Sequence, residues 1–184
     1  CGGGMYNQNS NPTLRNLVFA ENQAISGGAM YNLTSIPSLI NVSFESNNTI
    51  NNGPGGAIVN ATSNPTLTNV SFFDNSAPNG TGGAIYNANS QPILQQVLFE
   101  GNSALNGGAI YQFLGTLTVS NSIFSNNTAT QGGAIYNTNG GVVTLLNSDL
   151  RGNSATAGAA LFNVVEDSDM RLANVAISGN TATG

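Results

Sequence analysis

Apolar and polar residues alternate in short runs along this chain, and the same three runs recur from one end to the other. One unit contains a GGA[IM]YN run, an L-x-N run and a [VL]-x-F-x-x-N run, as at Gly27–Asn32, Leu39–Asn41 and Val42–Asn47. Alternation by twos, with Ile, Val, Phe or Tyr and a closing Asn or Gly, is typical of a short strand followed by a turn. No run keeps the apolar period of about 3.6 residues that a helix needs.

The unit repeats seven times. Its double glycine, or a near copy of it, stands at positions 3, 27, 55, 82, 107, 132 and 158, so successive units lie 24 to 28 residues apart. Three strands and three turns close one rung of a coil, and stacked rungs pair their strands in parallel about 4.8 Å apart. The pattern therefore predicts an all-β, three-faced parallel β-helix of seven rungs, a solenoid that takes up residues 1–184 as one domain.

Three apolar columns appear when the units are aligned, and we expect them to point inward as the core. The first column is Met5, Met30, Ile58, Ile85, Ile110, Ile135 and Leu161; the second is Leu14, Leu39, Leu67, Leu94, Val119, Leu145 and Leu172; the third is Phe19, Phe44, Phe72, Phe99, Phe124, Leu150 and Ile177. The paired glycines are expected to let the backbone turn tightly and approach the neighbouring rung.

Amide side chains form three further columns. One is asparagine without exception: Asn22, Asn47, Asn75, Asn102, Asn127, Asn153 and Asn180. The second is Asn16, Asn41, Asn69, Gln96, Asn121, Asn147 and Asn174, and the third is Asn7, Asn32, Asn60, Asn87, Gln112, Asn137 and Asn163. Stacked amides can hydrogen-bond along the rod, and Asn accepts the left-handed backbone of a sharp corner. Because they recur in every unit, we interpret them as structural ladders.

The composition limits the possible partners. Only 6% of the residues are charged, the net charge is −5, and the chain has three Arg, no Lys and no His. Nucleic-acid binding needs many cations to neutralise phosphates, so we expect no nucleic-acid partner. No run of about 20 apolar residues is present, so we expect no direct membrane insertion. The single cysteine, Cys1, rules out an internal disulfide and a Cys/His zinc site.

The acidic residues are the candidates for metal binding or catalysis. Glu21, Glu45, Asp74 and Glu100 follow the phenylalanine column and fall near one another in the alignment, and Glu166, Asp167 and Asp169 share one irregular segment. Either group could hold calcium weakly, although each is also read as a solvated row or loop. With no Lys or His and only dispersed Arg, no catalytic base or oxyanion group is in view. We therefore expect no enzyme activity, no metal site and no cofactor.

An aromatic column is the strongest candidate for binding. It consists of Tyr6, Tyr31, Tyr86, Tyr111, Tyr136 and Phe162, and Val59 interrupts it. These residues alternate with the inward Met/Ile/Leu column, so they should point outward. An exposed aromatic stripe can bind a sugar or a protein, whereas the alternative interpretation is that stacked tyrosines only stabilise the sheet face.

The GGA[IM]YN run followed by F-x-x-N (FAEN, FESN, FFDN, FEGN, FSNN) resembles the repeat of the bacterial polymorphic outer-membrane protein family. The resemblance covers all seven units, although the last reads GAALFN and ISGN. It implies a right-handed parallel β-helix on an extracellular, cell-surface protein, with a link to adhesion.

Two functions follow as expectations. The first is a non-catalytic extracellular rod, structural or adhesive, whose partner is a host or neighbouring-cell surface protein or glycan. Neither end of the sequence shows a polar cap, so the rod is also expected to be a segment of a longer array, or to associate head to tail into a filament. The alternative is a carbohydrate-binding or polysaccharide-processing β-helix that uses the aromatic column or the acidic segment.

Overall fold

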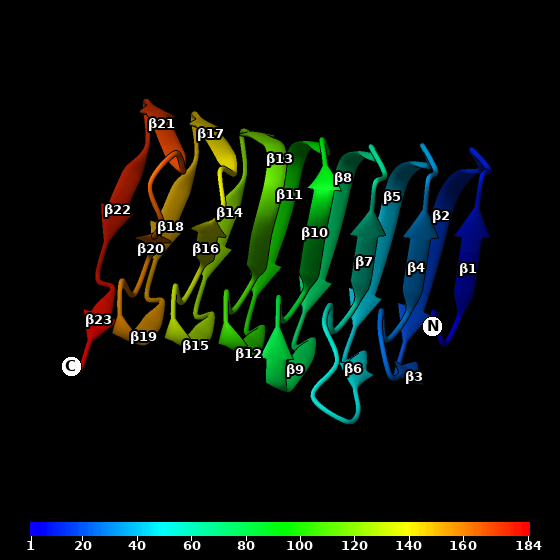
Figure 1. Cartoon of the computed structure of the whole chain (residues 1–184), viewed down its shortest axis with the longest axis horizontal. Helices are drawn as coiled ribbons and strands as arrows, with labels where there is room; N and C mark the ends of the chain where they lie inside the picture. Colours follow the sequence, from blue (N-terminus) through cyan, green and yellow to red (C-terminus); the bar gives the residue numbers. More distant parts are fainter.

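The computed structural model describes residues 1–184 and contains 23 strands and no helix. The strands wind into about seven turns of a rod, and the two termini lie at its opposite ends (Figure 1). Every strand pairs in parallel with the equivalent strand of the next rung, for example Met5 with Met30 and Phe19 with Phe44. The predicted parallel β-helix is therefore confirmed.

The strands form three faces that run the length of the rod. The first face contains β1 (Met5–Gln8), β4 (Met30–Leu33), β7 (Ile58–Ala61), β10 (Ile85–Ser90), the first half of β13 (Ile110–Ser120), β16 (Ile135–Thr138) and β20 (Leu161–Asn163). The second contains β2 (Thr13–Ala20), β5 (Ser38–Glu45), β8 (Thr66–Phe73), β11 (Ile93–Glu100), the rest of β13, β14 (Ile123–Ser125), β17 (Val142–Leu146), β18 (Asp149–Arg151), β21 (Asp169–Ala173) and β22 (Ala176–Ser178). The third contains β3 (Gln23–Ala24), β6 (Asn48–Thr49), β9 (Ser76–Thr81), β12 (Ser103–Asn106), β15 (Thr128–Gln131), β19 (Ser154–Ala157) and β23 (Thr181–Ala182).

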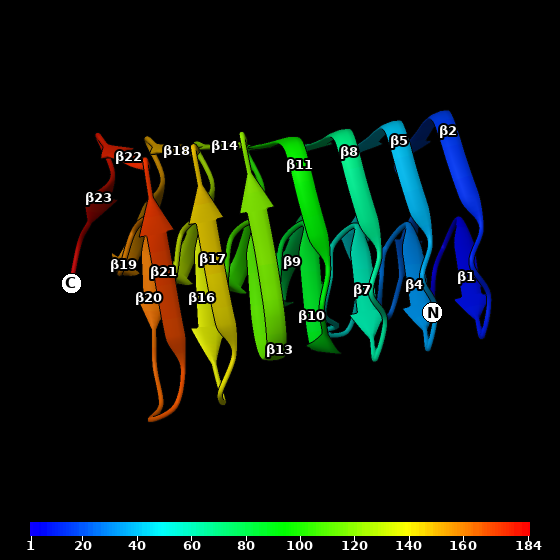
Figure 2. The ribbon, with the colours of Figure 1, turned by 90° about the horizontal axis from the view of Figure 1, so that it is seen from above.

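The second face differs from the prediction, because the L-x-N and [VL]-x-F runs are not separate strands in the first four rungs. They join into one strand of eight residues that bends in its middle, as in β5 and β8 (Figure 2). The bend lies at the amide residue of the L-x-N run, whose φ is between 49° and 56° in every rung. This left-handed residue resets the alternation of side chains. Leu39 and Val42 therefore both point into the core although they are three residues apart.

The third face is a short strand that the sequence pattern did not reveal. Its inward column is made of small residues, including Ala77, Ala104, Ala129 and Ala155, which are between 0 and 9% exposed. Alanine and serine carry little strand propensity, so nothing in these segments indicates a strand. The small side chains let this face approach the rest of the core closely.

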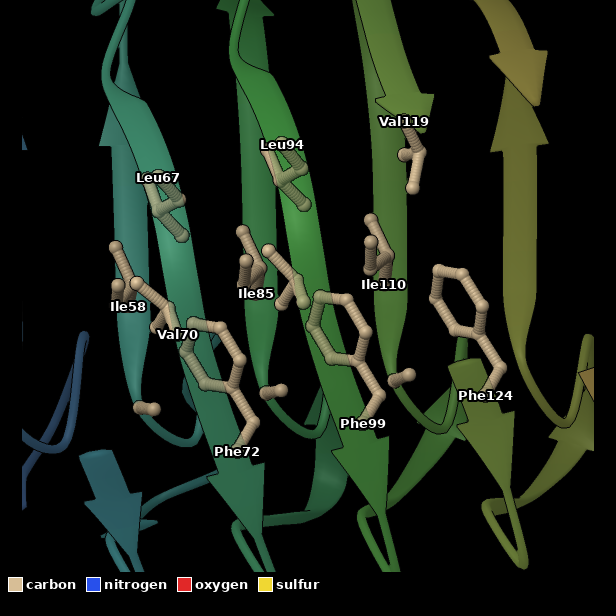
Figure 3. Packing of buried hydrophobic residues seen from close by; sticks show 14 of the residues in the cluster. Ile58, Leu67, Val70, Phe72, Ile85, Leu94, Phe99, Ile110, Val119 and Phe124 are labelled. Atoms are coloured by element: carbon tan, nitrogen blue, oxygen red, sulfur yellow. The ribbon is translucent and has the colours of Figure 1, made fainter. Parts of the chain in front are cut away.

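The three predicted apolar columns are in register and line the core, except in the last rung, where Leu172 and Ile177 are 41% and 50% exposed. Phe44, Phe72, Phe99 and Phe124 are fully buried, and successive ring centroids in this stack lie 4.6 to 5.0 Å apart. Figure 3 shows the last three of these residues. Two further columns, missed by the sequence analysis, complete the core. They are Val42, Val70 and Val97, and Ala29, Ala57, Ala84, Ala109, Ala134 and Ala160.

The double glycine has the two roles expected from the sequence. Its first residue has a positive φ, for example 66° at Gly107. A Cβ on its second residue would meet the backbone carbonyl oxygen of the next rung, at 2.2 Å in the case of Gly108 and Gly133. The first rung is aligned one residue earlier than its sequence suggests, because Met5 pairs with Met30 and so Gly2 corresponds to Gly27.

Candidate functional site

The unbroken asparagine column forms a continuous ladder inside the corner between the second and third faces. We call it the inner ladder: Asn22, Asn47, Asn75, Asn102, Asn127, Asn153 and Asn180. In each step the Oδ1 atom of one asparagine accepts hydrogen bonds from the Nδ2 and the backbone N of the asparagine one rung earlier, at 2.9 to 3.0 Å. The Nδ2 of Asn102 also donates to the carbonyl of Phe72. Every amide of the ladder takes part in these hydrogen bonds, so this column has a structural role.

A second inner ladder starts at Asn7 and is broken once. Side-chain amides link Asn7, Asn32, Asn60, Asn87 and Gln112 in order, at 2.7 to 3.0 Å. The side chain of Gln112 is one methylene longer, and its Nε2 donates to the carbonyl of Leu114. Asn137 Oδ1 is consequently buried without any hydrogen-bond partner. The ladder resumes between Asn137 and Asn163.

The remaining amide column lies on the outside of the wall. We call it the outer amide column: Asn16, Asn41, Asn69, Gln96, Asn121, Asn147 and Asn174, all exposed or nearly so. Hydrogen bonds join Asn41 to Asn16, Asn69 to Asn41 and Asn174 to Asn147, at 2.8 to 3.1 Å. No hydrogen bond links Gln96 or Asn121 to a neighbouring amide. This column is therefore only partly a ladder.

The expectation that the amides themselves adopt the left-handed corner holds only for the outer amide column. In the inner ladder the residue before each asparagine has the positive φ, as at Glu21, Ser46 and Asp74. In the second inner ladder it is the residue two places later, as at Asn9 and Thr34. An amide that must point inward needs an ordinary strand conformation, so the left-handed turn moves to a neighbour.

The predicted aromatic column is in register on the outward side of the first face. It consists of Tyr6, Tyr31, Tyr86, Tyr111, Tyr136 and Phe162, and adjacent rings are stacked with centroids 4.9 to 5.5 Å apart. Tyr6 is 46% exposed and the other members are half-buried. Val59 fills the gap and is only 2% exposed, because neighbouring side chains cover it.

The half-buried position of the tyrosines affects their ionisation. Burial, together with smaller contributions from the neighbouring Tyr136 and Tyr86, raises the pKa of Tyr111 to about 12. Burial likewise raises the pKa of Tyr86 and of Tyr136, and for Tyr86 the hydroxyl of Tyr31 contributes as well. The rings thus shield one another from water, which supports the packing interpretation in part, while their outer edges remain accessible.

A shallow groove follows the bend of the second face, and the sequence analysis missed it. One stretch, of about 410 Å³, lies over the first four rungs, and another, of about 550 Å³, over the last three. One wall is the outer amide column, and the other carries Val18, Ser43, Ser71, Leu98, Ile123 and Asp149. We call this feature the bend groove. The sequence does contain a signal for this groove. The alternation of apolar and polar residues breaks between the L-x-N and [VL]-x-F runs, so two consecutive residues, such as Ile40 and Asn41, lie outside the core.

A family model described as "Right handed beta helix region" matches residues 1–182. The chain belongs to this right-handed β-helix family. Searches of curated proteins and of solved structures found no match. The family agrees with the winding of the rungs and with the ladders, and it assigns no partner or reaction to the β-helix.

The acidic residues of this β-helix do not form the stripe suggested by the alignment. Glu45 and Glu100 share a column, but Phe73 stands between them, and Glu21 and Asp74 lie in the adjacent column of turn residues. No three acidic side chains form a group that could hold a metal ion.

Two of the three arginines are paired within their own strands. Arg151 binds Asp149, and Arg171 binds Asp169 at 2.7 Å. Asp169 is therefore engaged, and only Glu166 and Asp167 of the acidic segment point from the loop without an ion pair. The structure contains no α-helix long and apolar enough to span a membrane.

Proposed function

We propose that this β-helix is a non-catalytic, extracellular rod that presents its aromatic column as an adhesive surface. The carrying observation is the column of six aromatic residues, stacked as a pair and a group of four on either side of Val59, on the outward side of a parallel sheet. Such a surface offers large apolar area with few rotatable bonds, and the tyrosine hydroxyls add hydrogen-bonding groups at its edge. Leu33 and Phe113, in the neighbouring outward column, extend the apolar area.

The repeat's resemblance to polymorphic outer-membrane proteins supports the extracellular location and the adhesive role. The low charge of the surface fits contact with a protein or a glycan, and it does not fit nucleic acid. A non-catalytic role is supported by the scattered carboxylates and by the pairing of Arg151 and Arg171. The proposed partner is a protein or glycan on a host or neighbouring cell.

The test is a double substitution in the aromatic column. Beads that carry the rod are presented to a glycan array and to a panel of purified extracellular-matrix proteins, and Tyr111→Ser with Tyr136→Ser is compared with the unchanged chain. We expect the double variant to lose at least about tenfold in affinity for the matrix proteins that bind the unchanged rod. Because the rings stack, the melting temperature is measured alongside.

A matched control is Ile93→Ser with Thr118→Ser, two outward residues that pair on the second face. Ile93 is 53% exposed, so the control also removes an exposed apolar side chain. Retention of binding in the tyrosine variant, or equal loss in the control, contradicts the proposal. The absence of binding to every probe by the unchanged rod contradicts it as well.

Head-to-tail self-association, the other partner expected from the sequence, meets an obstacle at Ala159. In the preceding rungs this corner is glycine, and a Cβ there would lie 2.0 to 2.4 Å from a carbonyl oxygen of the next rung. Ala159 carries that Cβ, so a rung added beyond it cannot repeat the regular geometry at this corner. Electron micrographs of the unchanged chain and of Ala159→Gly test this: fibres only in the variant show that the alanine limits assembly, and fibres in both show that it does not.

A further inference from the structure

We propose that the bend groove is a second binding site, which takes a neutral, extended polysaccharide chain lying parallel to the rod axis. The site is separate from the aromatic column, because it lies on the second face and its lining shares no residue with that column. It therefore does not rest on the adhesive role of the tyrosines.

The two stretches of the groove form one path. Leu98 ends the first stretch and Ile123 begins the second, and these residues are paired neighbours on adjacent rungs. The path thus passes along the bend from Asn16 to Asn174. At about 4.8 Å per rung it is roughly 29 Å long, which suits a linear polymer better than a compact ligand.

The middle of the path offers amides that the fold leaves free. Gln96 and Asn121 are exposed, and neither takes part in the hydrogen bonds that join other members of the outer amide column. Each can supply donors and an acceptor to a ligand. Both residues are held in the left-handed conformation, with φ of 56° and 51°, so their side chains leave the wall from fixed backbone positions.

The opposite wall is apolar at the same two rungs. Leu98 and Ile123 are half-buried and point outward beside Gln96 and Asn121. A pyranose ring has apolar C–H faces and hydroxyl edges, so it can contact both walls at once. The amides recur at every rung, and this interval is close to the length of one sugar unit in an extended chain.

Charge and backbone pairing favour a neutral polysaccharide over a polyanion or a peptide strand. The only charged residue in the lining is Asp149, which is paired with Arg151, and the whole chain has a net charge of −5, so a polyanion would be repelled. A peptide strand cannot pair along the groove, because the backbone there is already bonded between rungs. The N–H of Asn121, for example, donates to the carbonyl of Leu146.

The experiment uses the double variant Gln96→Gly with Asn121→Gly. Glycine keeps the left-handed backbone at both positions and removes only the amides. Binding of cellohexaose is measured by calorimetry and by the shifts of side-chain amide resonances in NMR, with hexagalacturonate as the anionic comparison. We expect saturable binding of the neutral sugar, shifts confined to the bend groove, and a loss of at least about tenfold in affinity in the variant.

The variant Tyr111→Ser with Tyr136→Ser serves as the control and separates this site from the aromatic column. It should leave cellohexaose binding unchanged. If it abolishes that binding while the glycine variant retains it, the sugar binds the aromatic column and the groove proposal is wrong. Absence of saturable binding by cellohexaose, or tighter binding of hexagalacturonate, also overturns the proposal, and neither result affects the test of the aromatic column with protein probes.

Discussion

The inner ladder and the outer amide column contain the same residue type at the same interval, yet they do different work. In the inner ladder, Asn102 is fully buried and bonds to Asn75, Asn127 and Phe72. In the outer amide column, Asn121 is exposed and linked to no other amide. Recurrence alone therefore does not distinguish a structural amide from one that is available to a ligand.

The difference comes from the backbone at each position. The outer residues have the left-handed conformation themselves, which turns their side chains away from the core at a bend. The inner residues keep a strand conformation beside a left-handed neighbour, so their amides point inward and replace the water they lose with hydrogen bonds. Identical substitutions in the two columns should consequently have unequal effects.

The largest effect is expected for Asn102→Asp. The carboxylate would replace the Nδ2 donor beside the oxygens of Phe72 and Asn127, in a fully buried position. Burial of this kind raises a carboxyl pKa by about 3–5 units, so at neutral pH the folded protein loses about 4 kcal/mol of stability relative to the unfolded chain, in which the carboxyl ionises freely.

The sign of the pH dependence follows from the raised pKa of the introduced carboxyl. The folded state then binds more protons than the unfolded state, so stability falls as pH rises above about 4. Chemical denaturation at acidic and neutral pH measures this. A loss of stability that is the same at both pH values would contradict the buried environment assigned to Asn102.

A gain of stability is expected where the second inner ladder is broken. Gln112→Asn shortens the side chain by one methylene, so that its Nδ2 can reach Asn137 Oδ1, which is buried without a partner. Satisfying a buried acceptor is worth about 1–3 kcal/mol. The chain offers a matched control in Gln96→Asn, the same change in the outer amide column.

Thermal and denaturant unfolding of the two variants sharpen the comparison. Gln96→Asn should alter stability by less than about 0.5 kcal/mol, because the amide is exposed and Asn tolerates the left-handed backbone. Equal stabilisation by both changes would point to a general preference for asparagine, and the ladder explanation would then be wrong.

The tyrosines show that side chains on the outward side of the sheet differ in solvent exposure. The pKa of Tyr111 is raised to about 12 in the folded state. The free energy of unfolding therefore keeps the full contribution of the neutral Tyr111 below about pH 10, and it loses that contribution as the pH rises from about 10 to about 12. Absorbance titration should show Tyr111 ionising near pH 12, about two units above the ordinary tyrosine pKa. Substitution of Tyr111 by Phe should remove the late-ionising phase; its persistence would assign that phase to another residue.

Much of the fold could be predicted from the sequence because each rung repeats one geometric problem. Column membership follows from spacing, and all three apolar columns are in register as expected. Whether an amide column points inward or outward depends on which residue has the positive φ. The sequence does not reveal this, because both Asn16 and Asn22 simply end an apolar run. The third face escaped prediction because Ala77 and Ala104 carry no strand signal.

The candidate sites were predicted unequally for the same reason. The aromatic column could be found because Tyr alternates with an inward aliphatic residue in an ordinary strand. The bend groove could not, because it depends on the direction in which Asn41 and Asn69 bend the strand. Three-residue spacing of buried positions such as Leu39 and Val42 is the sequence feature that marks such a bend.

The smallest effect is expected for Asn121→Asp, the outer counterpart of Asn102→Asp. Asp also tolerates the left-handed backbone, and its carboxylate would stay in water, so stability should change by less than about 0.5 kcal/mol. The difference in unfolding free energy between the two Asn→Asp variants, measured at one neutral pH, compares a buried amide position directly with an exposed one. If Asn121→Asp costs as much as Asn102→Asp, the outer amide column is a structural ladder after all, and its amides are not available to a ligand.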